Sequence, residues 1–217
     1  MTHSAKLIWI TPDAENTIAY CARVSNPSNQ TNHDTAPRLL QYCINHQHWS
    51  VFEMASMCVE INTTRSIAAQ ILRHRSFSFQ EFSQRYAQVV GDPVIPELRL
   101  QDHKNRQNSI DVLEPSEELV VLKSQIADYF DEGMDLYHQL LDAGVAKECA
   151  REVLPMAAPT KLYMNGTIRS WLHYCDLRTS NGTQKEHALI AAQVQDILYE
   201  NLPNVCEAMW NKNLSEA

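Results

Sequence analysis

Glycine is scarce in this sequence, and the scarcity excludes the nucleotide-binding folds that depend on glycine-rich loops. The chain has 5 glycines in 217 residues, against a typical share of about 7%. No two of them lie close together, so neither a G-x-G-x-x-G nor a G-x-x-x-x-G-K-[ST] phosphate loop can be written. If this protein binds a phosphate, side chains and helix ends must hold it.

Charge and composition are those of an ordinary globular protein. Acidic residues outnumber basic ones 26 to 18, giving a net charge of −8, and 44% of the residues are hydrophobic. A chain of this length can bury the core of one domain, and we expect residues 1–217 to form a single domain. Because the sequence lacks an overall basic character, we expect no nucleic-acid partner.

Cysteine usage and apolar runs bear on the compartment. The 6 cysteines form no CxxC pair. Their even number leaves disulfides open, but reduced thiols are favoured for a chain of this size whose first residues lack the apolar core of a signal peptide. The longest apolar stretch, 188–192, is far too short for a membrane span. We therefore expect a cytoplasmic protein with no membrane partner.

Hydrophobic periodicity predicts a mainly helical α+β domain with a modest sheet. We expect a strand at 6–10, β character at 55–61 and helices at 35–46, 64–73, 116–143, 146–154, 168–176 and 184–200. Ile67, Ile71 and Leu72 are expected to point inward from the second helix, and Trp171, Leu172 and Leu177 could face the core from the fifth. Two polar stretches, 25–35 and 102–111, are predicted as loops.

The densest polar cluster is Arg-His-Arg at residues 73–75. Adjacent cationic groups repel one another and favour a bound anion, and guanidinium groups suit phosphates. If residues 80–85 are extended, Glu81, Ser83 and Arg85 share one face and offer an acceptor, a hydroxyl and a guanidinium fork to a nucleotide. The alternative is a solvated basic helix end that interacts with its own helix dipole, and charge alone favours that alternative.

A second basic group lies later in the sequence. Arg169 and His173 are i, i+4 neighbours on one predicted helix face, Arg178 follows at the helix end, and Arg151 lies on another helix. Structural ion pairs would explain any one of these residues taken singly.

His46 and His48 could be two metal ligands, but no acid or cysteine stands at a convincing spacing to complete the set, so we expect no metal site. Contact between this segment and a ligand is equally consistent with its sequence. Cys175 lies beside Tyr174 and Asp176, which would not activate its thiol.

Taken together, these residues resemble the flavin-dependent thymidylate synthases, the ThyX family. Residues 73–83 read R-H-R-x7-S, the signature of that family, and 48–53 resembles its H-x-[ST]-x-F-E segment. Arg151 before V-L-P, Arg169-Ser170 and Leu177-Arg178 follow in the family's order. Gln80, Gln84, Thr167 and Met54 depart from the residues that many members carry.

The resemblance implies a compact α/β fold, a ThyX-like single domain with a mostly antiparallel sheet, in a homotetramer whose active sites are shared between subunits. It implies reductive methylation of dUMP to dTMP through FAD, with 5,10-methylenetetrahydrofolate as one-carbon donor and NADPH as the expected hydride source. The protein would be cytoplasmic in a bacterium, or in the host cytoplasm if the chain is viral.

The resemblance also implies roles for individual residues. FAD would be contacted by His48, Ser50, Arg73, His74, Arg75, Glu81, Thr167, Ile168, Arg169 and His173. The nucleotide dUMP would be contacted by Gln70, Ile71, Leu72, Arg73, Glu81, Phe82, Ser83, Gln84, Arg85, Arg178 and, from a neighbouring subunit, Arg151. Arg178 would be the catalytic residue at the uracil ring.

Two other classes of function remain as hypotheses. A non-catalytic nucleotide-binding or RNA-binding module could use residues 73–75, although the acidic net charge of −8 counts against it. A helical interaction protein is weaker still, since it gives no reason for several separate polar clusters.

Overall fold

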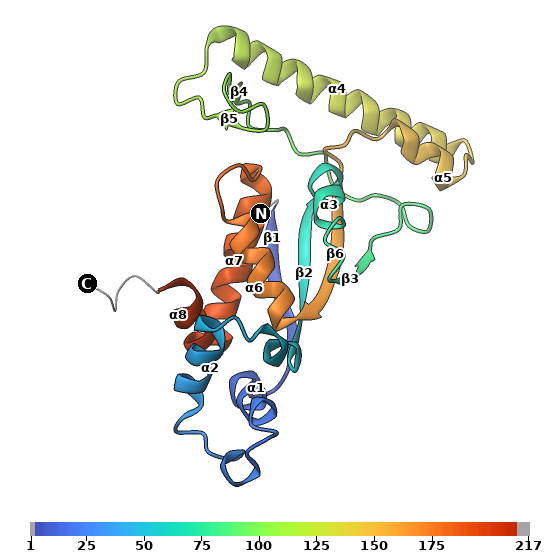
Figure 1. Cartoon of the computed structure of the whole chain (residues 1–217). Helices are drawn as coiled ribbons and strands as arrows, with labels where there is room; N and C mark the ends of the chain where they lie inside the picture. The colour runs from blue at the N-terminus through green and yellow to red at the C-terminus, as the bar shows by residue number, and fades with distance from the viewer. Residues whose placement is uncertain (1–2, 212–217) are drawn as a thin grey trace.

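A four-stranded antiparallel sheet lies at the centre of this computed structural model, which describes residues 3–211 (Figure 1). Its strand order is β1-β2-β6-β3, with β1 at Ser4–Ile10, β2 at Ser56–Thr64, β6 at Pro159–Thr167 and β3 at Ser78–Glu81. The strand pairs are antiparallel, as expected, so the fold is α+β.

The two central strands, β2 and β6, position the segments that carry the polar clusters. In β6, Thr160, Leu162 and Met164 are buried while the residues between them are more exposed, as a strand with one covered face requires. The pairing of β2 with β6 runs from Ser56 opposite Thr167 to Thr64 opposite Pro159.

Helices from both ends of the chain build the main core beside this sheet (Figure 1). The helix α2 packs against α8, α6 against α7, and α7 against β1. The largest fully buried side chains include Trp171, Tyr174, Phe52 and Leu40. The bounds are α1 Ala14–Ala22, α2 Ala36–Asn45, α6 Ile168–Arg178, α7 Lys185–Asn201 and α8 Pro203–Trp210, with short 3₁₀ turns η1 at Pro27–Asn29 and η2 at Trp49–Glu53.

A second, smaller apolar cluster forms where α4 (Glu117–Asp142) meets α5 (Lys147–Ala150) and the 3₁₀ turn η3 (Arg151–Val153). It contains Val89, Met134 and Tyr137, and the Tyr137 hydroxyl accepts the Val89 amide at 3.1 Å. Most of α4 lies away from the sheet (Figure 1). The Ser116 hydroxyl caps this helix by accepting the Leu119 amide.

Five of the six predicted helices are found, with α3 at Arg65–Ile71, whereas the one expected at 146–154 is only the short α5 followed by η3. The helices α1 and α8 and the strand β6 are elements that the sequence reading missed. The stretch 102–111, predicted as a loop, forms the tip and the second strand of a small hairpin, in which β4 Leu100–Gln101 pairs with β5 Ser109–Ile110. No helix within residues 3–211 is long and apolar enough to cross a membrane.

Three expectations about side-chain directions are wrong. Leu72 follows the end of α3 and is 37% exposed, and Leu177 is 43% exposed because the buried face of α6 carries Trp171 and Tyr174 instead. The segment 80–85 is extended only as far as Glu81. The chain then turns, and the Ser83 carbonyl accepts the amides of the third and fourth residues after it, so 81, 83 and 85 do not share a strand face.

Candidate active site

The Arg-His-Arg segment at 73–75 forms the turn between α3 and β3. Arg73 and Arg75 are exposed, whereas His74 is half-buried. No ion pair of Arg73 or Arg75 is found within residues 3–211. Two guanidinium groups are thus available to an anion at this turn.

The inward-pointing His74 joins this turn to the end of α6. Nε of Arg178 donates a hydrogen bond of 2.9 Å to Nε2 of His74. Burial, together with the positive charges of Arg178 and His173, lowers the pKa of His74 to about 4. The imidazole is therefore neutral near pH 7 and can accept from the guanidinium.

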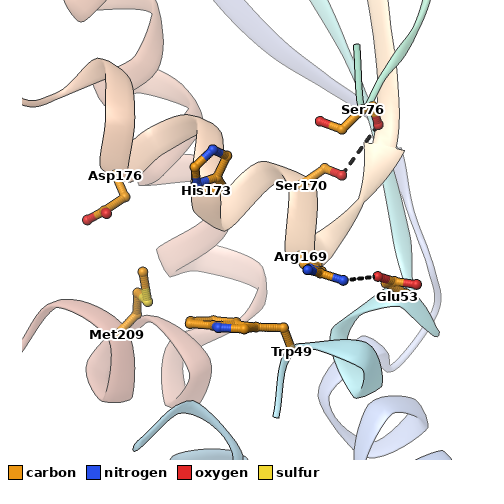
Figure 2. A pocket seen from close by; sticks show the side chains of 8 residues that line it. All are labelled: Trp49, Glu53, Ser76, Arg169, Ser170, His173, Asp176 and Met209. Carbon is orange, nitrogen blue, oxygen red and sulfur yellow. Dashed lines mark hydrogen bonds and ion pairs between the residues drawn. The ribbon is translucent and has the colours of Figure 1, made fainter. Parts of the chain in front are cut away.

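A cleft of about 480 Å³ opens beside the N-terminal half of α6 (Figure 2). Thr167 caps this helix, its hydroxyl accepting the Ser170 amide at 3.3 Å. Arg169 pairs with Glu53 of η2, and Trp49, His173 and Asp176 complete much of the lining. Two carboxylates, Glu53 and Asp176, line this cleft with one arginine, so its side chains carry no net positive charge. The aromatic ring of Trp49 and the positive N-terminal end of α6 suit a ring-containing ligand whose polar groups can accept hydrogen bonds.

Glu81, at the end of β3, is already paired within the chain. Its Oε1 accepts from Nη1 of Arg65 at 2.6 Å and from the Thr160 hydroxyl at 3.1 Å. These contacts fix the carboxylate at the base of the turn that carries Ser83.

The remaining phosphate-binding candidates lie toward α5. Arg85 forms an exposed ion pair of 2.8 Å with Glu148, and Arg151 lies in η3, 3.4 Å from Glu152. Gln84 is 6% exposed, and its Nε2 has no hydrogen-bond partner among the described residues.

The structure therefore arranges the expected site residues in three groups within one chain. The first contains Arg178 with His74 and the flanking arginines, the second is the α6 cleft with Arg169 and His173, and the third lies near α5 with Arg85 and Arg151.

Other expected residues lie near these groups. Ser50 is exposed in η2, and His48 is exposed just before it. The side-chain amide of Gln70 donates to Gln184 at 2.6 Å, and Phe82 packs against the smaller apolar cluster. Ile71 and Ile168 have fully buried side chains, so neither side chain is exposed to a ligand. The backbone amide of Ile168 is also occupied, because it donates to the Ala55 carbonyl.

Several residues at these groups were not found by sequence reasoning. Tyr174 and His187 lie behind His74, Arg65 and Thr160 hold Glu81, and Trp49 lines the cleft. Four of these residues gave a weak sequence signal, because each stands alone in an otherwise ordinary helix or strand pattern. Trp49 could have been found, since it lies inside the 48–53 segment that resembles the family's motif.

Comparisons with known proteins show the family of this chain. The profile of the Thy1 family, described as thymidylate synthase complementing protein, matches residues 6–204. A probable flavin-dependent thymidylate synthase of Paramecium bursaria Chlorella virus 1 is 51% identical over 213 residues, which are 95% of this chain and 98% of that protein. The flavin-dependent thymidylate synthase of Synechocystis sp. PCC 6803 is 48% identical and covers 90% of this chain and 89% of its own length.

Among solved structures, the UMP/dUMP methylase PolB from Streptomyces cacaoi, bound with 5-Br dUMP, shares the fold. The TM-score is 0.83 at 24% identity, with 95% of this chain and 93% of that chain covered. The family profile and the close relatives extend over nearly the whole chain. The chain belongs to the Thy1 family of flavin-dependent thymidylate synthases.

Proposed function

We propose that this chain, as one catalytic domain, converts dUMP to dTMP by reductive methylation, with 5,10-methylenetetrahydrofolate as the one-carbon donor, FAD as the cofactor and NADPH as the hydride source. Family membership supports the reaction. The observation that carries the residue assignment is the 2.9 Å hydrogen bond between Arg178 and His74, because it joins the R-H-R signature to a further arginine more than a hundred residues away.

Arg178 is the proposed catalytic residue. Its Nε is occupied by His74, which leaves the two Nη groups as a fork for the substrate. Carbon 5 of uracil becomes a nucleophile when electron density is pushed into the ring. A guanidinium keeps its charge at every relevant pH, so placed at N3 and O2 it stabilises the anionic ring.

The α6 cleft and the 73–75 turn fit a flavin dinucleotide. Arg73 and Arg75 would bind its phosphates, while Thr167, Arg169 and His173 would contact it from the capped start of α6 and Ser50 from η2. When bound, FAD would supply the redox chemistry. Burial raises the pKa of the Cys175 thiol, so this residue is unsuited to act as a thiolate nucleophile.

Arg85, Ser83 and the Arg151 of a neighbouring subunit would bind the dUMP phosphate, and this assignment requires an oligomer. The helix α4 supports it. Of its 26 residues two are buried within the chain, whereas Val120, Val121, Tyr129 and Leu136 are between 45% and 63% exposed. So many exposed apolar side chains on one helix are typical of a subunit interface, and we propose a homotetramer with shared active sites.

The experiment is an absorbance scan of the purified protein followed by an assay for dTMP formation with dUMP, methylenetetrahydrofolate and NADPH. The protein is expected to be yellow and to turn over. Arg178→Ala should abolish turnover while flavin stays bound, and Arg38→Ala, which changes an exposed arginine of α2, is the matched control.

A colourless protein without turnover would overturn the proposed function in favour of a simple binding module. Near-native turnover by Arg178→Ala would overturn the role of that arginine alone.

A further inference from the structure

We propose that His187 and Tyr174 are a positioning pair for the Arg178–His74 couple, an inference that rests on the proposed function. Neither residue is expected to touch substrate. Their role is to hold the His74 ring in the one orientation that accepts the Arg178 hydrogen bond.

The first step of the argument is the tautomer of His74. An arginine Nε–H can only donate, so the His74 Nε2 atom that it contacts at 2.9 Å must present a lone pair. The ring proton then resides on Nδ1. A ring turned over about its χ2 axis would point a different edge at Arg178 and lose this bond, which leaves the direction of the guanidinium fork unfixed.

The second step is what prevents that rotation. Tyr174 stands edge-on to the His74 ring, with centroids 5.0 Å apart and an interplanar angle of 75°, and the His187 ring lies 6.1 Å from it at 89°. Phe77 closes another side at 6.4 Å. The imidazole thus sits among three rings that all meet it nearly at right angles.

The third step is what holds Tyr174. Its hydroxyl lies 3.1 Å from Nε2 of His187, and both side chains are fully buried. His187 comes from the first turn of α7, whereas Tyr174 and Arg178 belong to α6. The hydrogen bond therefore ties Tyr174, which packs against His74, to a second helix and restrains the tyrosine ring.

A purely structural role explains His187 poorly. Its Nδ1 is buried without a hydrogen-bond partner among the described residues, and burying an unpaired polar atom costs free energy that an aliphatic side chain would not. Burial and the nearby Arg178 and His74 lower its pKa to about 3, so the ring is neutral. An imidazole at this buried position is therefore less favourable for stability than an aliphatic side chain would be. Its hydrogen bond with Tyr174 explains why a histidine is present here.

The test compares two substitutions that remove the bond with one that keeps it. His187→Leu deletes both nitrogens, and Tyr174→Phe deletes the hydroxyl but keeps the ring. In His187→Gln the carboxamide can reach the position of Nε2. We expect the first two to lower kcat for dTMP formation by about tenfold with KM for dUMP nearly unchanged, because a small misplacement of an orienting group slows the chemical step. His187→Gln should retain most of the rate.

A second readout does not depend on turnover. The ¹⁵N shifts of the His74 ring report its tautomer, and we expect a pure Nδ1–H form in the native protein and in His187→Gln, but a mixture in His187→Leu and Tyr174→Phe. Tyr199→Phe is the control. This tyrosine packs beside Trp210 at 5.6 Å, and within residues 3–211 it is not among the three rings that surround His74.

Each outcome decides one claim. If folded Tyr174→Phe keeps both the native kcat and the native His74 tautomer, the positioning role is wrong, and this variant gives an answer even where His187→Leu fails to fold. If the native protein forms no dTMP, the proposed function fails instead, and the ¹⁵N shifts still test the restraint on His74.

Discussion

Gly166 lies in β6 at a place where a methyl group has no room. A Cβ built there would lie 2.5 Å from Cδ1 and 2.7 Å from Cε1 of the Phe77 ring. Carbon atoms in ordinary contact are about 3.5–4.0 Å apart. Gly166→Ala would therefore force the ring to move by about 1 Å.

The direction away from Gly166 is occupied. The Phe77 ring packs 4.7 Å from Trp171 and 6.0 Å from Tyr174, and both of these side chains are fully buried. Overpacking of this kind costs about 1–3 kcal/mol, offset by about 0.4–1 kcal/mol because alanine has less backbone freedom to lose than glycine. We expect Gly166→Ala to lower the free energy of unfolding by about 1–2 kcal/mol, which lowers Tm by about 2–8 °C for a chain of this size.

The assay is thermal unfolding followed by circular dichroism, with denaturant titration as a second measure. Gly133→Ala is the matched control, because Gly133 lies inside α4 and a Cβ there would approach nothing closer than the Val153 carbonyl oxygen at 3.7 Å. Removing a helical glycine should raise stability by about 0.5–1 kcal/mol.

A double-mutant cycle isolates the contact. In a Phe77→Val background the ring atoms are gone, so Gly166→Ala should become neutral or stabilising even though Phe77→Val alone costs stability. If Gly166→Ala raised Tm as Gly133→Ala does, the reasoning about Phe77 would be refuted.

Three further predictions concern stability. The pKa of His187 is about 3 in the folded protein, whereas a histidine of the unfolded chain takes up a proton below about pH 6.5. The free energy of unfolding should therefore fall as the pH drops from about 6.5 towards 3. In His187→Gln this pH dependence should be smaller by about one proton, which denaturant titrations at pH 7 and pH 4.5 would measure. Arg99, whose side chain is 9% exposed, pairs with Glu186 at 2.8 Å, and Arg99→Met should cost about 3 kcal/mol because the largely buried carboxylate loses its cationic partner and keeps only the Gln184 amide at 2.9 Å; an unchanged midpoint in urea would contradict this. Gly144 has a φ of +80° with no atom within 4 Å of an added Cβ among the described residues, so Gly144→Ala should cost about 1 kcal/mol through backbone strain alone, and a rise in Tm would show that the turn relaxes freely.

Much of the candidate site could be read from neighbouring residues in the sequence. The R-H-R-x7-S spacing, the Arg169–His173 helix face and the cap at Ser116 are local patterns. The last two predict helices, and both helices, α6 and α4, are present. The direction of Leu72 could not be read in this way. It continues the apolar pattern of α3, but the helix ends one residue earlier, at Ile71, and the chain then turns through residues 73–75.

Partnerships between distant residues were beyond the reach of sequence patterns. Nothing local indicates that Arg65 and Thr160 would hold Glu81, since one lies in a helix, one in β6 and one in β3. These contacts exist because β3 pairs with β6 in one register, with Glu81 opposite Leu162. A shift of one residue would turn every side chain of β3 to the other face.

The sequence by itself determined most of the helices and the chemistry available, through helical periodicity, a shortage of glycine that excludes phosphate loops, and the arginine signature of the family. The tertiary structure alone decided which groups meet. It placed Phe77 against Gly166, one position beyond the Ser78–Asn165 pair, and set His74 against Arg178 with His187 behind it. The reason is physical: periodicity and capping act within a few residues, whereas contacts across the sheet and between helices depend on register and close packing of the whole chain.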